Sequence, residues 1–162
     1  MTRPIFVNSE DELRGMREAG RLASRVLKYI DPFVTVGVTT KELNDLCYKY
    51  ILDHNGIPAP LEQGFPTAVC TSVNHVVCHG IPGDKPLRDG DIINIDVAVR
   101  LNRWHGDTSR MFCVGNITRQ AQILIDTTYE CMMAGISTVR PGSRLGDIGY
   151  AIQSWSESRG FS

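Results

Sequence analysis

One stretch, Asp91–Val114, constrains the fold more than any other part of this sequence. It reads DIINIDVAVRLNRWHGDTSRMFCV: a run rich in isoleucine and valine, a polar break at 101–103, and a second extended run. β-Branched residues at this density, bounded by a polar break, are typical of a strand that is largely buried. The stretch therefore predicts two antiparallel strands that are joined by a tight turn.

Besides Asp91 at its first position, this predicted hairpin contains two aspartates. If the chain folds back at Leu101–Asn102, Asp96 faces Asp107, and directly opposite residues have Cβ atoms about 4.5–5.5 Å apart. Two carboxylates that close, in an apolar setting, cannot both stay charged without a proton or a cation between them. The alternative is a pair of solvated strand-edge charges, which fits less well because Asp96 is embedded in INIDVAV. The pair therefore predicts a divalent metal held by oxygen ligands.

Composition restricts the class of protein. A chain of 162 residues with 42% hydrophobic and 22% charged residues is typical of a single soluble globular domain. A net charge of −1 gives no electrostatic case for nucleic acid or an anionic membrane. No apolar run reaches the roughly 18 residues of a spanning helix, and the N-terminus lacks a secretory signal. The five cysteines, without a C-x-x-C motif, indicate reduced thiols and a cytoplasmic location.

Capping boxes and terminating residues predict four helices. Ser9 with Glu12 and Thr39 with Glu42 place the first two, which end near Pro32 and Gly56, respectively. Two more helices are predicted over residues 119–137 and 144–159, a loop over 56–66, and an extended segment over 67–82. The order helix, glycine-containing connector, helix, terminating glycine occurs twice. The sequence thus predicts two weakly similar repeats, with 1–115 as the first and 116–162 as the start of the second.

A histidine near the predicted hairpin could join the aspartates. In the predicted strand NHVVCH, alternation places His75 and His79 on one face. A lone histidine in a strand is usually a hydrogen-bonded structural residue. His79 differs because the sharp turn Gly80–Ile81–Pro82 follows it directly and holds the end of the strand open. A histidine with two carboxylates suits metal-assisted hydrolysis.

Three motifs resemble those of one known family. SVNHVVCHGIP, INIDVAV and WHGDTSRMF are similar, in order and spacing, to motifs of type I methionine aminopeptidases, and the resemblance covers essentially the whole chain. It implies an α/β pita-bread aminopeptidase fold, with the first half complete and the second half truncated after its helices. The family removes the initiator methionine from nascent polypeptides with a metal-activated water. Its complete site holds two divalent ions, for which Co, Mn, Fe, Zn and Ni are not distinguishable here.

Matched by position, the resemblance assigns roles to three residues. Asp96 would bind one metal, Asp107 would bridge both, and His79 would contact the substrate and stabilise the tetrahedral intermediate. His105 would support the hairpin. His75 stands where the family usually has an acidic residue, which could alter the charge of the pocket. The family's other ligands, a histidine and two glutamates, have no matching position, so we expect the isolated chain to be inactive as a peptidase.

Three hypotheses follow. The chain is the N-terminal portion of a methionine aminopeptidase, or a non-catalytic truncated paralogue that binds nascent chains, ribosomes or a partner, or a mononuclear metal-binding domain. Under the first hypothesis its partners are peptides with an N-terminal methionine and nascent chains, with the ribosome left open. Neither nucleic acid nor a membrane is indicated directly, and the chain is expected to be a monomer.

Overall fold

The computed structural model describes residues 9–162 of the chain. They form two compact units: the first ends at Asn116 and the second spans Ile117–Ser162. None of the helices in the described part of the chain combines the length and the apolar character that crossing a membrane requires.

The first two helices begin where the capping boxes predict. The Ser9 hydroxyl accepts a hydrogen bond from the Glu12 amide (3.3 Å), and the Ser9 amide donates to the Glu12 carboxylate (2.8 Å). This reciprocal pairing starts α1 (Glu10–Ile30), which ends in a short 3-10 helix (Asp31–Phe33). Thr39 and Glu42 start α2 (Thr40–Asp53) in the same way.

The predicted hairpin is confirmed and forms the centre of an antiparallel sheet. Strand β3 (Ile92–Leu101) pairs along its whole length with β4 (Trp104–Cys113). The N-terminal part of β3 also pairs with β2 (Cys70–Val73), and its C-terminal end pairs with β1 (Gly56–Pro58).

The loop predicted for residues 56–66 is wrong in its first half. Residues 56–58 pair with the end of β3 as β1, and the short helix α3 (Ala59–Glu62) follows directly. Pro58 is compatible with a strand here because β1 is short and lies at the edge of the sheet. Pro60 is compatible with the first turn of α3, where the missing amide hydrogen costs nothing.

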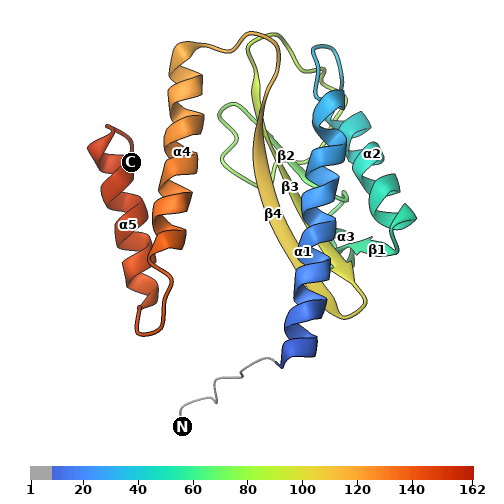
Figure 1. Cartoon of the computed structure of the whole chain (residues 1–162). Coiled ribbons are helices and arrows are strands. Elements are labelled where there is room, and N and C mark those ends of the chain that lie inside the picture. Colours follow the sequence, from blue (N-terminus) through green and yellow to red (C-terminus); the bar gives the residue numbers. More distant parts are fainter. Residues whose placement is uncertain (1–8) are drawn as a thin grey trace. The chain divides into compact units, whose positions relative to one another are not determined.

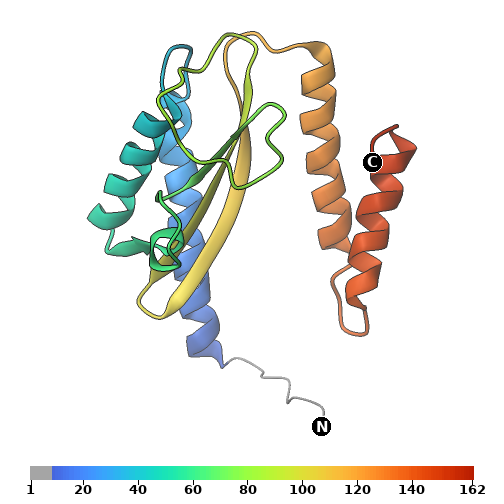
Figure 2. The same ribbon diagram turned by 180° about the vertical axis from the view of Figure 1, so that it is seen from behind.

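The core of the first unit lies on one face of the sheet. Alternate residues of β3 (Ile93, Ile95, Val97 and Val99) are fully buried, together with side chains of α1 and α2. Helix α1 lies across this face of the hairpin (Figures 1 and 2). The intervening residues of β3 are only partly buried, so the opposite face of the hairpin, here called the open face, is available for chemistry.

The second unit contains the two predicted helices, which pack together as a helical hairpin. It consists of α4 (Arg119–Ser137), which Thr118 caps, and α5 (Leu145–Ser158). The two helices approach closely at Gly135, where an added Cβ would lie 2.9 Å from the Ile152 side chain.

Candidate functional site

Asp96 and Asp107, here called the carboxylate pair, lie on the open face of the hairpin but not directly opposite each other. The predicted register is wrong by two positions, since Asp96 pairs with Ser109 and Asp107 pairs with Ala98. The turn is centred one residue later than predicted, with Asn102 in the left-handed conformation at φ 56°. A shift of two residues preserves the face of each side chain. The two aspartates are therefore diagonal neighbours on one face.

The environment of Asp96 disfavours its charged form. Its carboxylate is half-buried, whereas Asp107 is exposed. Burial raises the pKa of Asp96, and so do the negative charge of Asp107 and a hydrogen bond between the two carboxyl groups, while the nearby His79 lowers it. Without a cation, the ionised pair therefore opposes folding, and a bound cation would relieve this cost.

We expect Asp96→Asn to stabilise the chain in the presence of EDTA by roughly 0.2–1 kcal/mol, the range of cross-strand pair energies. The pKa of Asp96 is higher in the folded state than in the unfolded state. The free energy of unfolding of the wild type therefore falls as pH rises through the folded-state pKa and Asp96 loses its proton. The advantage of the variant should thus be absent below the unfolded pKa, about 3.9, and should grow with rising pH. Urea unfolding between pH 4 and 8 measures it, and a variant less stable than the wild type at pH 8 would contradict the expectation.

Asn74 ends β2 earlier than predicted. Its backbone is left-handed at φ 52°, its Oδ1 accepts a hydrogen bond from the Ile92 amide (3.0 Å), and its Nδ2 donates to the Asp91 carboxylate (2.8 Å). The left-handed backbone turns the chain out of the strand direction, and the bonds to residues 91 and 92 hold this turn. The prediction that His75 and His79 alternate on one strand face is therefore wrong, because both lie in the loop that follows.

The loop nevertheless returns His79 to the hairpin. The Thr71 amide in β2 donates to the Gly80 carbonyl (2.8 Å), and the Gly80 amide donates to the Ser72 hydroxyl (3.2 Å). His79 is exposed and has a left-handed backbone at φ 54°, which is uncommon outside glycine and is enriched at functional sites. This geometry places the imidazole close enough to Asp96 to affect its pKa.

Cys70 is a component of the site that the sequence did not single out. It pairs directly with Asp96 across β2 and β3 and is only 7% exposed. Burial raises the pKa of its thiol, and the charges of Asp96, Cys78 and Asp107 raise it further. The thiol is therefore neutral near pH 7 and forms an unreactive wall beside the carboxylate pair. Only the pairing of β2 with β3 reveals this position.

His105, the predicted supporting residue, pairs with Arg100 across β3 and β4. Arg100 binds the Glu62 carboxylate of α3 through its Nε (2.8 Å) and Nη2 (2.7 Å). Hydrogen bonding from Arg100 lowers the pKa of Glu62, and His105 contributes to the same effect. These residues attach α3 to the end of the hairpin.

The carboxylate pair has the donor chemistry of a divalent metal site, since oxygen ligands suit Mg²⁺, Mn²⁺ and related ions. Residues 9–162 contain no group of three histidine, cysteine, aspartate or glutamate side chains that could hold a metal together. The structure therefore does not support the hypothesis of a mononuclear site built from His79, Asp96 and Asp107. It offers two adjacent carboxylates that fit a cation and a histidine beside them.

Comparisons with known proteins identify the family. The model of metallopeptidase family M24 matches residues 14–162. Methionine aminopeptidase of Rickettsia prowazekii is 55% identical over 159 residues, which cover 98% of this chain and 61% of that protein. Its crystal structure superposes with a TM-score of 0.94, covering 96% of this chain and 63% of that one. Methionine aminopeptidase of Thermotoga maritima superposes with a TM-score of 0.93 at 29% identity, covering 97% of this chain and 64% of that one.

The likeness also establishes the fold. The chain spans about three fifths of the length of these relatives, and within that span the predicted α/β pita-bread aminopeptidase fold is confirmed. Because the family model matches nearly the entire sequence, this chain belongs to metallopeptidase family M24.

Proposed function

We propose that this chain contributes the carboxylate pair of a metal-dependent methionine aminopeptidase, which removes the initiator methionine from nascent polypeptides. The observation that carries the proposal is the adjacency of Asp96 and Asp107 on the open face, where burial and mutual repulsion favour a bound cation. A relative named methionine aminopeptidase, which is 55% identical, supports the same activity.

In this proposal each residue has a distinct role. Asp96 and Asp107 would hold the two divalent ions through their carboxylate oxygens. When bound, such ions supply Lewis acidity toward water and the scissile carbonyl. His79, held beside the pair by its loop, donates a hydrogen bond to the reacting carbonyl group and stabilises the charge that develops there. The neutral Cys70 limits the access of bulk water to Asp96 from the side of β2.

A metal titration of the chain tests the ligands. Because two carboxylates are a small ligand set, we expect weak binding of Mn²⁺ or Co²⁺ by calorimetry. Asp96→Asn and Asp107→Asn should each weaken metal binding by roughly 10–100-fold. This is the loss seen when a residue that only orients a metal ligand is replaced, and losing a ligand itself should cost at least as much. Asp84→Asn, which removes an exposed carboxylate elsewhere, should leave it unchanged. Absence of binding would favour the alternative, a non-catalytic partner-binding module, and two tight sites would require ligands that the proposal does not include.

The same proposal places the protein in the cytoplasm as a monomer, where nascent chains are its substrates. The carboxylate pair does not discriminate among Mn, Fe, Co, Ni and Zn, so the identity of the metal depends on other ligands and on availability. Growth of the source cells in defined metals followed by metal analysis of the purified protein addresses this point.

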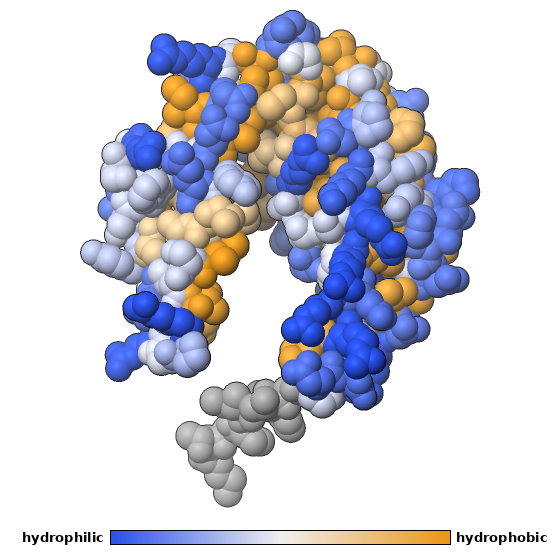
Figure 3. Space-filling view, in the orientation of Figure 1, coloured by the Kyte–Doolittle hydropathy of each residue, from blue (hydrophilic) through white to orange (hydrophobic). Residues whose placement is uncertain are grey.

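A row of exposed basic side chains on α1 supports the ribosome as a proposed partner. Five exposed cations, here called the α1 basic stripe, recur along α1 at steps of three and four residues, and they are Arg14, Arg17, Arg21, Arg25 and Lys28. Such spacing puts them on one side of the helix over roughly 21 Å, and Figure 3 shows a strongly hydrophilic band along α1. In the described part of the chain, Arg14 alone among them has a carboxylate within ion-pair distance, that of Asp11 at 3.1 Å.

Ribosomal RNA matches this stripe better than a lipid surface does. Arginine binds phosphate oxygens with two parallel hydrogen bonds. A membrane-surface helix needs a free apolar side, whereas the apolar side of α1 is buried in the core of the first unit.

We expect the chain to bind an RNA duplex weakly at low salt, with log K falling against log[salt] at a slope of about −3 to −4 if four phosphates are neutralised. Arg21→Glu with Arg25→Glu should abolish this binding in fluorescence anisotropy. The control, Lys49→Glu on α2, lies outside the stripe. Binding that survives the double reversal would remove the stripe from the proposal, and binding to anionic vesicles alone would replace RNA as the partner.

A further inference from the structure

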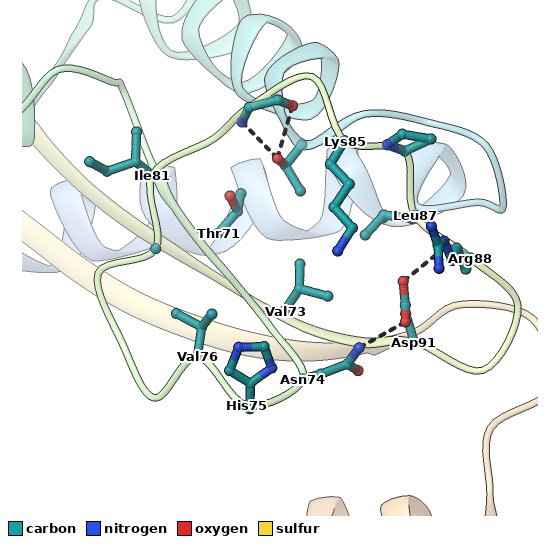
Figure 4. A pocket seen from close by; sticks show the side chains of 14 residues that line it. Thr71, Val73, Asn74, His75, Val76, Ile81, Lys85, Leu87, Arg88 and Asp91 are labelled. Atoms are coloured by element: carbon teal, nitrogen blue, oxygen red, sulfur yellow. Dashed lines mark hydrogen bonds between the residues drawn. The ribbon is translucent and has the colours of Figure 1, made fainter.

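The first unit contains a cavity that the carboxylate pair does not line. It has a volume of about 360 Å³ and is lined by residues of β2, the following loop, and the segment that leads to β3 (Figure 4). This volume falls within the range of small-molecule sites, about 300–1,000 Å³. Asp96, Asp107 and His79 do not line it. It is called the Lys85 pocket below.

The wall of the Lys85 pocket carries more positive than negative charge. Lys85 and Arg88 line it with His75, and Asp91 is its one carboxylate. Asp91 is already engaged, since it accepts hydrogen bonds from the Asn74 side chain (2.8 Å) and the Arg88 amide (2.9 Å). No carboxylate of residues 9–162 lies within ion-pair distance of the Lys85 ammonium. Figure 4 shows the Lys85 side chain reaching into the cavity toward Val73.

The rest of the wall is mostly apolar. Val73, Val76, Ile81 and Leu87 line the cavity, and the valine and isoleucine of the loop are partly exposed to it, at 36% for Val76 and 62% for Ile81. Asp91 offsets one of the two cations, so the wall carries one net positive charge, which favours a ligand that has an apolar body and a single negative charge. For a dianionic phosphate, the cost of dehydration against these apolar side chains would exceed the gain from one net positive charge.

Thr71 supplies an unsatisfied polar group at the same wall. Its side chain is 4% exposed, and its Oγ1 is buried without a hydrogen-bond partner in the part of the chain that the structure describes. Buried hydroxyls are normally bonded. Rotation about the Cα–Cβ bond exchanges the hydroxyl and the methyl group between staggered positions, and this turn would let the hydroxyl donate to a bound acceptor.

We propose that the Lys85 pocket binds a small organic monocarboxylate, with the carboxylate on Lys85 and the apolar body against Val73 and Val76. Thr71 donates the second hydrogen bond to the carboxylate. Asn74 and Asp91 tie the loop to the start of β3 and so keep the pocket open. The proposal is independent of peptidase activity, because it uses none of the residues assigned to the metal site.

Benzoate is the probe, with benzamide as its neutral isostere and acetate as the carboxylate without an apolar body. In ¹⁵N–¹H correlation spectra of the whole chain, we expect saturable shifts of the Thr71, Val73 and Val76 amides with benzoate. Binding of benzamide and of acetate should each be at least about tenfold weaker, since one charge-assisted contact or one buried ring is lost.

Lys85→Met keeps the length of the side chain and removes its charge, so it should weaken benzoate binding about tenfold. The same change at Lys49, which pairs with Asp53 on α2, should have no effect. Thr71→Val should also weaken binding, while the unliganded chain becomes more stable because the unbonded hydroxyl is gone. This opposite pair of effects separates a binding role from misfolding.

Three results would overturn the proposal. The first is no saturable shift with benzoate up to about 10 mM, tenfold above a weak, roughly millimolar Kd. The second is equal affinity for benzoate and benzamide, which would mean an apolar cavity without charge recognition. The third is tighter binding of inorganic phosphate than of benzoate, which would mean a simple oxyanion site.

Discussion

Replacing Asp107 with asparagine is expected to lower kcat/KM by roughly 10³-fold in an enzyme with a complete site. Such an enzyme can be made by joining this chain to the part of the Rickettsia prowazekii relative that it does not cover, given 55% identity over the shared region. Asparagine keeps the shape of the side chain but loses the charge that would balance the metal ions in the proposed site. Metal ions contribute several kcal/mol to transition-state stabilisation, and each 1.36 kcal/mol is a factor of about ten.

The measurement is turnover of a Met-Ala-Ser peptide with Mn²⁺ or Co²⁺. The 162-residue chain alone should show none, and the fusion should be active. Asp84→Asn in the fusion is the matched control because that carboxylate is exposed and lies outside the hairpin. His79→Ala should lower kcat while leaving the metal content of the fusion unchanged. An Asp107→Asn fusion within tenfold of the parent would show that this residue is not a metal ligand.

Gly106→Ala is expected to cost about 3 kcal/mol of folding free energy, at the upper end of the range for overpacking. Gly106 lies on the buried side of β4, where a Cβ would overlap the backbone of Ala19 in α1. A flexible side chain could move away, but the backbone of a packed helix cannot do so without separating α1 from the hairpin. For a chain of this length the loss corresponds to a fall in Tm of roughly 6–12 °C.

Gly20→Ala is the control for this prediction. Gly20 lies in α1 next to Ala19, and no atom lies within 4 Å of a Cβ added there. Alanine at this position should therefore stabilise the chain by roughly 0.5–1 kcal/mol through its higher helix propensity. Thermal and urea unfolding compare the two variants. If both glycine variants shifted stability in the same direction, the close approach of α1 to β4 would not explain the glycine in the WHGD motif.

Much of the site can be predicted from the sequence, because successive side chains of a strand lie on alternate faces of the sheet. Asp96 and Asp107 were expected directly opposite each other, and the turn at Asn102 moved the register by two positions. The period of a strand is two residues, so an error of two left both carboxylates on the same face. The position of His79 cannot be predicted in this way, because Asn74 ends the strand and the loop that follows has no regular alternation of side chains.

By itself, the sequence determined the features that arise within a few residues along the chain. The capping boxes at Ser9 and Thr39 set where α1 and α2 begin, because side chain and backbone bond across three residues. The apolar run in β3 likewise predicted the central strand.

Only the tertiary structure decided what depends on distant partners. Strand β1 exists because residue 56 meets residue 101, and Cys70 joins the site because β2 pairs with β3 at Asp96. The wall of the Lys85 pocket likewise joins Thr40 of α2 to the segment 71–91, which is distant from it in the chain. A local pattern carries no information about such partners, because the entropy lost in closing the loop between them is offset only by the packing of the whole unit.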